Sequence, residues 1–416
     1  MFGRKSKKET SPEYLCPHCF GRFRMSEAHS VCSRTYCMNE YVTSKDYTDS
    51  KKYLSLNGDY EIDYEYTKFR GLDPQSKDAI PAKHHIVRNG SMKCDMCGRP
   101  TYIRLCPYCH NEIPPGAEEG GNSIFVVLGP KGVGKSHYIA VLVDQLSNHV
   151  AGEFKAVFNP AGDSTMVHYN DMYRDPLFKE KRKLDSTKPY NMGNDSREPL
   201  VYYMSVNRNG VSKVFTFAFI DTAGEDTTST DSIQDSNLDT LIAGAAGIVF
   251  LVDPLQIKYI RDRIHIDNLP PVTNNATETL NIISNVIRRK QELGSRGRIG
   301  IPLAVSLTKC DVLLKAPEDE EEDKILFSPG SAVRIPRESG RYDAENFEQI
   351  DVEIEEYLRR TAGEDFIQTV NGFEDHCYFA VSALGNNPES KELQRGVMPM
   401  RVEDPFIWLL NRKGME

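Results

Sequence analysis

The sequence predicts an α/β protein in which a mostly parallel sheet carries helices on both faces and follows a small cysteine-rich module. Three observations support this prediction. Beyond residue 122, short apolar runs rich in β-branched residues alternate with longer segments of helical periodicity. A glycine-rich loop at 129–136 joins the first of these runs to the first helical segment. Eight of the ten cysteines lie between positions 16 and 109, which sets this region apart.

The composition limits the class of protein. Hydrophobic residues make up 39% of the 416, enough for one large domain or two to three smaller ones. The longest apolar run, at 243–252, is too short to span a bilayer, and the basic start at 1–8 is not followed by the apolar region of a signal peptide. We therefore expect a cytoplasmic protein without a transmembrane segment. The net charge of −9 argues against nucleic acid as the main partner.

Changes in composition divide the chain into three regions. Residues 1–12 form a basic, polar tail that we expect to be disordered. Residues 13–118 form the cysteine-rich module. Prolines, acidic residues and paired glycines at 114–121 indicate a linker, so residues 119–416 form the remaining domain.

The elements of this last domain follow from its periodicity. A buried strand is expected at 123–128 and a helix at 137–150, whereas the segment 151–199 is expected to be one unusually long loop. Arg208-Asn209-Gly210 predicts the turn of a hairpin. We expect further strands at 200–207, 213–220, 247–253, 301–307 and 377–381, and helices at 277–293, 344–362 and 405–411.

The glycine-rich loop matches the phosphate-binding pattern G-x-x-x-x-G-K-[ST], and it stands between a strand and a helix as that motif requires. Its glycines permit backbone conformations that let the N–H groups cradle phosphate at the start of a helix. Lys135 would lie near the β- and γ-phosphates, and the hydroxyl of Ser136 would bind Mg²⁺. The expected phosphate-binding residues are Gly129, Pro130, Lys131, Gly132, Val133, Gly134, Lys135 and Ser136.

A second nucleotide motif, D-x-x-G, follows the strand that ends near residue 220. Asp221 is expected to hold Mg²⁺, since a carboxylate is a hard oxygen ligand. The backbone N–H of Gly224 would contact the γ-phosphate, so this loop would respond to the presence of that phosphate.

The strand at 301–307 ends in Thr308-Lys309-Cys310-Asp311, which matches [NT]-K-x-D. Asp311 can accept two hydrogen bonds from guanine, whereas adenine offers no such pair of donors and would leave the carboxylate unpaired. The alkyl part of Lys309 can cover the plane of the base. GTP is therefore expected rather than ATP, and an ATPase is the alternative. Ser382, Ala383 and Leu384 follow the last strand and are expected to contact the guanine oxygen through a backbone N–H.

The motifs GPKGVGKS, DTAG, TKCD and VSAL, in this order, resemble those of GTPases of the translation-factor and Ras-like (TRAFAC) clade, over residues 122–416. The strand that ends in Val252-Asp253-Pro254, the long segment before Asp221 and the cysteine module resemble the bacterial double-GTPase families. This resemblance implies a P-loop GTPase fold and a molecular switch. It also implies a partner GTPase or GTPase-activator-like protein, and a place in a bacterial conflict or defence system.

Two departures from the Ras-like pattern bear on catalysis. Glu225 stands where those proteins have glutamine, and its charge would oppose the charge that develops on the phosphate. The threonine that closes over Mg²⁺ is not evident; Thr187 is the first choice and Thr165 the second. Slow hydrolysis is therefore expected without an activator, and a zinc-binding adaptor that binds nucleotide without turnover is the other alternative.

The cysteines of the module occur in closely spaced pairs, as in zinc ribbons, where thiolates bind Zn²⁺ tetrahedrally. We expect one site from Cys16, Cys19, Cys32 and Cys37, and another from Cys94, Cys97, Cys106 and Cys109. The alternative is crossed ligation, in which cysteines from both halves of the module bind the same zinc ion. Four thiolates complete each site, so the nearby histidines 18, 84, 85 and 110 are not expected to be ligands. Nearly balanced charges favour a protein-docking role for the module, and tyrosines 60, 64 and 66, alternating with acidic residues, predict a half-buried strand.

Overall fold

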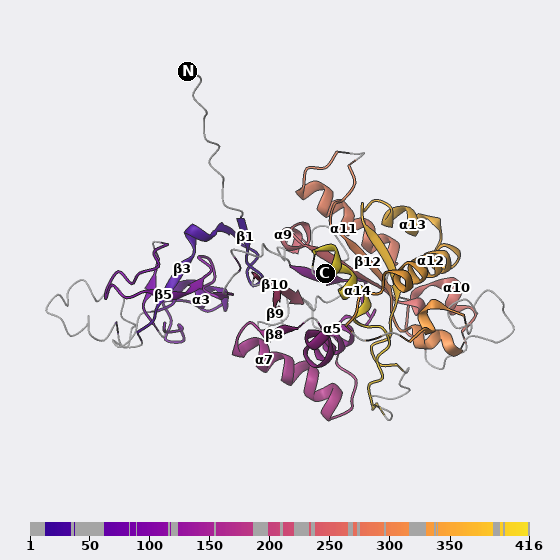
Figure 1. Ribbon diagram of the computed structural model, residues 1–416, viewed down its shortest axis with the longest axis horizontal. Helices are drawn as coiled ribbons and strands as arrows, with labels where there is room; N and C mark the ends of the chain where they lie inside the picture. Colours follow the sequence, from indigo (N-terminus) through magenta and orange to yellow (C-terminus); the bar gives the residue numbers. More distant parts are fainter. Residues whose placement is uncertain are drawn as a thin grey trace, which may run out of the picture. The chain divides into compact units, whose positions relative to one another are not determined.

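The computed structural model describes most of the chain, and every structural statement below concerns this part. The described residues are 13–34, 37, 62–82, 84–88, 90–114, 117, 124–153, 155–185, 199–208, 211–219, 233, 238–264, 269–272, 275–294, 297–315, 330–336, 338, 340–385, 392–393 and 396–414. The chain divides into two compact units, Met1–Asn122 and Ser123–Glu416, which we describe separately (Figure 1).

The second unit is built on a seven-stranded sheet with the strand order β13-β12-β11-β7-β10-β9-β8. Its strands are β7 (Phe125–Leu128), β8 (Ala156–Pro160), β9 (Leu200–Arg208), β10 (Val211–Phe219), β11 (Gly247–Val252), β12 (Leu303–Leu307) and β13 (His376–Ala380). The pairings that join β10, β7, β11, β12 and β13 are parallel, and β9 pairs antiparallel with β8 and β10. The predicted mostly parallel sheet is thus confirmed.

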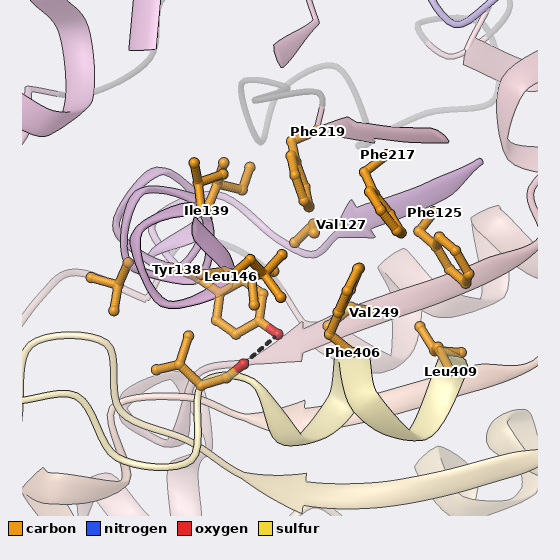
Figure 2. Close-up of a cluster of buried hydrophobic side chains, with 14 of the residues drawn as sticks. Phe125, Val127, Tyr138, Ile139, Leu146, Phe217, Phe219, Val249, Phe406 and Leu409 are labelled. Carbon is orange, nitrogen blue, oxygen red and sulfur yellow. Dashed lines mark hydrogen bonds between the residues drawn. The ribbon is translucent and has the colours of Figure 1, made fainter. Parts of the chain in front are cut away.

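Helices cover both faces of this sheet. On one face, α5 (Lys135–Gln145) and α14 (Asp404–Arg412) pack against side chains of the central strands, including Phe125, Phe217 and Val249 (Figure 2). Figure 2 also shows the hydroxyl of Tyr138, which donates a hydrogen bond to the backbone oxygen of Val402 at 3.0 Å. Burial of these side chains away from water is the main stabilising contribution to this layer.

The opposite face carries α9 (Leu238–Ala243), α11 (Ala276–Lys290) and α13 (Glu364–Val370) (Figure 1). Successive residues of a strand point to opposite faces, so Ile248, Phe250 and Val252 of β11 face these helices and are fully buried. The longest helix, α12 (Ala344–Thr361), packs beside the edge strand β13 and begins at Asp343, whose carboxylate accepts a hydrogen bond from Asn346 N. A short helix, α10 (Lys258–Arg261), follows β11.

A glycine sets how closely α14 approaches the sheet. A Cβ at Gly247, the first residue of β11, would lie 2.8 Å from Leu409 Cδ2 and 3.0 Å from the ring of Phe125. The absence of a side chain at this position therefore lets the helix lie directly on the strand.

The segment 151–199 is not one long loop, as the sequence had suggested. It contains the edge strand β8, the helix α7 (Asp163–Tyr169) and a π-helical segment at Asn170–Lys179. Two further short segments, at Leu146–Val150 and Ala151–Glu153, extend the helix α5. Thr165 lies buried in α7, so it is a helix residue and not a loop threonine.

The first unit consists of two small antiparallel sheets. One contains β1 (Glu13–Leu15) and β2 (Arg22–Arg24); the other has the order β4-β3-β5-β6, with β3 (His29–Cys32), β4 (Ile86–Val87), β5 (Thr101–Leu105) and β6 (Glu112–Ile113). Tyr64 and Tyr66 lie in the helix α3 (Tyr64–Phe69), so the strand expected there is wrong. The carboxylate of Asp63 accepts a hydrogen bond from Tyr66 N and caps this helix, which explains why the acidic residues fit a helix start.

Candidate functional site

The phosphate-binding loop lies at the carboxyl end of β7 and leads into α5. Gly134, with φ of 94°, is the residue before this helix, and a Cβ at Gly129 would lie 2.8 Å from the backbone oxygen of Leu251. Lys135 Nζ donates hydrogen bonds to the backbone oxygens of Gly129, at 2.8 Å, and Pro130, at 3.1 Å. The buried ammonium group is thus held against the loop at the start of a helix, where phosphate binding is favoured.

The loop that follows β12 is bonded to the phosphate-binding loop. Thr308 Oγ1 lies 3.1 Å from the backbone oxygens of both Val133 and Val252, and its single hydrogen can donate to either. Lys309 Nζ donates to the backbone oxygen of Gly132 at 2.9 Å. The residues expected to read the base and those expected to bind phosphate therefore form one connected structure.

Asp253 completes this connection, and the sequence motifs did not identify it as a functional residue. Its carboxylate lies 2.6 Å from Lys309 Nζ and also accepts a hydrogen bond from Leu255 N at 2.9 Å. The side chain of Asp253 is 2% exposed and that of Lys309 is 32% exposed. A carboxylate directly after a buried parallel strand was the available signal, because ligands bind at the carboxyl ends of such strands.

Asp311 and Ser382 lie side by side at the same edge of the sheet. Ser382 Oγ donates to the carboxylate of Asp311 and accepts a hydrogen bond from Gly385 N at 3.0 Å. Backbone hydrogen bonds in both directions between Ser382 and Met400 fix this segment, and Leu384 accepts another from Met398 N. The half-buried Ala383 lies between them. The structure thus brings the expected guanine-reading carboxylate together with the segment that follows β13.

His137, which the sequence analysis did not single out, links the helix α5 to a more distant segment. Its Nε2 atom accepts a hydrogen bond from Leu184 N at 3.2 Å. Burial is the largest cause that lowers the pKa of His137, and together with the charges of Lys309 and Lys183 it brings this pKa to about 4. A neutral imidazole is the form that can accept this bond.

The cysteines of the first unit form two groups of four. Within each group, the sulfur atoms all lie within 4.8 Å of one another. Cys16 Sγ lies 3.6 Å from Cys109 Sγ, and Cys19 Sγ lies 3.7 Å from Cys106 Sγ. In the other group, Cys32 with Cys97 and Cys37 with Cys94 have sulfur separations of 3.7 Å. A tetrahedral zinc site with Zn–S bonds of 2.3 Å has an S–S separation of about 3.8 Å, so both groups fit Zn²⁺.

This grouping corrects the expected one, in which each half of the module held its own site. The first and last pairs form one cluster, and the second and third pairs form the other. The reason is the antiparallel pairing of β3 with β5, which places His29 opposite Leu105 and Cys32 opposite Thr101. The end of β3 therefore lies beside the turn at 94–97 and its beginning lies beside Cys106.

Within both clusters the thiols differ in acidity. Hydrogen bonds with Cys106, Cys109 and Cys16 hold the pKa of Cys19 well below its ordinary value, whereas burial raises the pKa of Cys16. In the other cluster, the backbone N–H of Arg99 lowers the pKa of Cys97 to about 7. Each cluster therefore favours at least one thiolate, the form in which cysteine binds metal.

Comparison with known proteins identifies the family. Residues 124–379 match the family described as Double-GTPase 2. The chain belongs to this double-GTPase family. It is also 30% identical over 324 residues to a protein of Mycolicibacterium smegmatis described as "Putative ESX-1 scaffolding and assembly protein SaeC", with 75% of this chain and 80% of that protein covered.

Among solved structures, this double-GTPase is similar to the GTPase-like domain of Ski7 from S. cerevisiae bound to GTP, with 14% identity and a TM-score of 0.29. The match covers 70% of this chain and half of that one. A signal recognition particle receptor complex, SRb-GTP/SRX from Chaetomium thermophilum, matches with 10% identity and a TM-score of 0.30 over 65% of this chain and 94% of that one. At such scores the likeness assigns nothing beyond the topology given above.

Several predicted site residues of this double-GTPase lie outside the described residues. These are Thr187, Asp221, Gly224 and Glu225. Ser136, the expected Mg²⁺ ligand of the phosphate-binding loop, lies half-buried in the first turn of α5. In the described part of the chain, no helix combines the length and the apolar character that crossing a membrane requires.

Proposed function

We propose that this chain is a GTP-hydrolysing molecular switch whose zinc-stabilised N-terminal unit docks another protein. The observation that carries the proposal is the connected set of contacts between the two loops after β7 and β12. Lys135 is held against the phosphate-binding loop, Lys309 bonds to that loop at Gly132, and Asp311 lies beside Ser382. These residues would bind the phosphates, cover the base and read the guanine edge.

Magnesium fits this arrangement through Ser136, and we propose Asp221 as a second group on the metal. When bound, Mg²⁺ supplies positive charge to the β- and γ-phosphates. Lys135 and the loop N–H groups would stabilise the charge that develops on the transferred phosphoryl group.

Hydrolysis is expected to depend on a partner. The carboxylate of Glu225 cannot donate a hydrogen bond to the γ-phosphate, and its charge opposes the charge that develops there. We propose that a partner GTPase or an activator-like protein supplies the missing positive group, most simply an arginine.

The cellular role that we propose is nucleotide-regulated assembly of a larger protein complex. The name of the M. smegmatis relative, a putative scaffolding and assembly protein, supports this role more directly than it supports the bacterial conflict system that the family resemblance implies. The eight clustered thiols, none of them in a disulfide, suit the reducing environment of the cytoplasm.

Single-turnover hydrolysis of GTP by the full chain with Mg²⁺ tests the proposal. We expect a rate of about 10⁻⁴ to 10⁻² s⁻¹, the range of unassisted GTPases. Glu225→Gln should raise this rate, while the neighbouring change Asp226→Asn should leave it unchanged.

Three outcomes would contradict parts of this proposal. A rate near ~1 s⁻¹ without a partner would show that the chain carries its whole catalytic set. Tight GTP binding with no turnover, even with the partner, would favour the adaptor alternative. Equal affinities for ATP and GTP would favour an ATPase.

A further inference from the structure

A group of polar side chains in the first unit lies outside both cysteine clusters. Asp63 and Glu65 come from the start of α3, His29 begins β3, and His110 follows the last cysteine pair. One ligand atom from each of Asp63, Glu65 and His110 lies within 4.8 Å of the other two. This group contains no cysteine, and His110 was not expected to bind the metal of the cysteine sites.

Asp63 fixes the orientation of the His110 ring. The distance from His110 Nδ1 to Asp63 Oδ1 is 2.6 Å, and the same oxygen accepts the hydrogen bond that caps α3. Because a carboxylate can only accept, Nδ1 carries the proton and Nε2 presents its lone pair. The His110 side chain is completely buried, so this lone pair points into the protein and away from solvent.

His110 Nε2 lies close to two other atoms that can bind a metal ion. His29 Nδ1 lies 2.8 Å from His110 Nε2, and Glu65 Oε2 lies 3.6 Å from it. Ligand atoms around a tetrahedral zinc ion bound by nitrogen and oxygen are about 3.3 Å apart, as its bonds of 2.0–2.1 Å require. The two observed distances lie on either side of that value, and rotation of the His29 and Glu65 side chains would have to bring their ligand atoms together with His110 Nε2 around one ion.

We propose that His29, Glu65 and His110 form a third metal site of this chain, which binds Zn²⁺ or a similar first-row divalent ion. Two imidazoles and one carboxylate are a donor set that such ions prefer. Asp63 is a positioning residue that holds His110, as carboxylates commonly do behind metal-bound histidines. Glu65 is 28% exposed, which leaves a solvent side for water as the fourth ligand.

Two contacts of the metal-free chain would break when the ion binds. Without metal, His29 Nδ1–H donates to His110 Nε2; when the ion binds, this proton moves to Nε2 of His29 through solvent and Nδ1 becomes a ligand. Arg88 Nη2 lies 3.4 Å from Glu65 Oε2, and both side chains are about one-third exposed, so the guanidinium can turn to water. The ion would then join β3, α3 and the last cysteine turn, which are far apart in the sequence.

Metal counting with the full chain tests this proposal. The chain is reconstituted with Co²⁺, and thiolate-bound ions are separated from the others by the sulfur-to-cobalt charge-transfer band, which only cysteine ligation produces. We expect three ions per chain, two with thiolate bands and one without. The variants His29→Gln and Glu65→Gln should each lose the ion without thiolate bands and keep the other two. Glu13→Gln, which alters an exposed glutamate of β1, should keep all three.

Two results of this experiment would overturn the proposal. A wild-type chain without any ion outside the thiolate sites would overturn the proposal and leave a hydrogen-bonded chain from Asp63 to His29. A third ion that persists in both variants would place it elsewhere and equally overturn the assignment. Unchanged thiolate bands in the variants show that the unit is folded, and GTP binding is measured separately, so failure here leaves the proposed function untouched.

Discussion

In the ion pair between the buried Asp253 and the partly exposed Lys309, replacing one partner should destabilise the fold more than replacing the other. Replacing Lys309 by Met leaves a carboxylate that is 2% exposed without its cation, and the loss of one partner of a buried pair costs about 3–5 kcal/mol of folding free energy. Replacing Asp253 by Asn leaves Lys309, which is 32% exposed and can turn to water. That change should cost only about 1–2 kcal/mol, the value of a charge-assisted hydrogen bond reduced by solvent screening.

The ion pair between Asp253 and Lys309 also predicts that the Asp253 variant binds GTP more weakly. In Asp253→Asn, Lys309 keeps its bond to Gly132 but loses the charge attraction that holds its stem in place, so GTP should bind about tenfold more weakly, a change of about 1.4 kcal/mol. Urea unfolding without nucleotide and calorimetric titration with GTP measure the two effects. The control is Asp262→Asn, whose ion pair with Lys258 has the same 2.6 Å length but is exposed; it should change neither quantity. Equal destabilisation by the Asp253 and Lys309 variants would refute this reasoning.

Four further predictions concern the remaining sites. Lys135→Ala should abolish triphosphate binding, checked by calorimetry, and leave the metal content unchanged. Asp311→Asn should shift the preference from GTP toward xanthosine triphosphate, because an amide can donate to the ring carbonyl; an unchanged preference in competition binding would contradict the guanine-site assignment. Changing Cys16 and Cys106 together to Ser should remove one zinc ion by elemental analysis, whereas sites confined to each half would lose two. The pKa of His137 is about 4 in the folded chain, below its ordinary value of 6.5, so the unfolded chain binds more protons between these two pH values. The free energy of unfolding should therefore decrease as the pH is lowered from 6.5 to 4, by up to about 1.4 kcal/mol per pH unit. His137→Gln should reduce this pH dependence, as measured by urea unfolding.

Much of the central fold could be predicted from local sequence. The strands β7 and β11 are continuous apolar runs and β12 is interrupted only by Ser306, which is typical of parallel strands buried on both faces. The loop between β7 and α5 could also be recognised, because its glycines and Lys135 carry both the conformation and the chemistry.

Other features depended on contacts between distant residues. The edge strand β8 has only one side bonded to a neighbour, and its pattern around Val157 is too short to be distinguished from a loop. The helix α3 is specified by the cap at Asp63 rather than by periodicity. The grouping of the cysteines follows from the register between β3 and β5, which spacing along the chain does not encode. The position of Asp253 directly after a buried strand was a signal in the sequence, and its distance to Lys309 shows which residue it contacts.

The arrangement of the cysteine clusters has a consequence for how the first unit folds. The contact between Cys37 and Cys94 spans 57 positions, and it lies inside the span of 87 positions between Cys19 and Cys106. When the cluster with Cys37 and Cys94 forms first, it shortens the loop that the cluster with Cys19 and Cys106 must still close. The second cluster then costs little further loop-closure entropy, so we expect the inner cluster to form before the outer one. The length of the chain between Cys37 and Cys94 enters this entropy only logarithmically, and doubling a loop adds about 0.6 kcal/mol. Related chains can therefore gain or lose many residues at this point while both clusters keep their geometry.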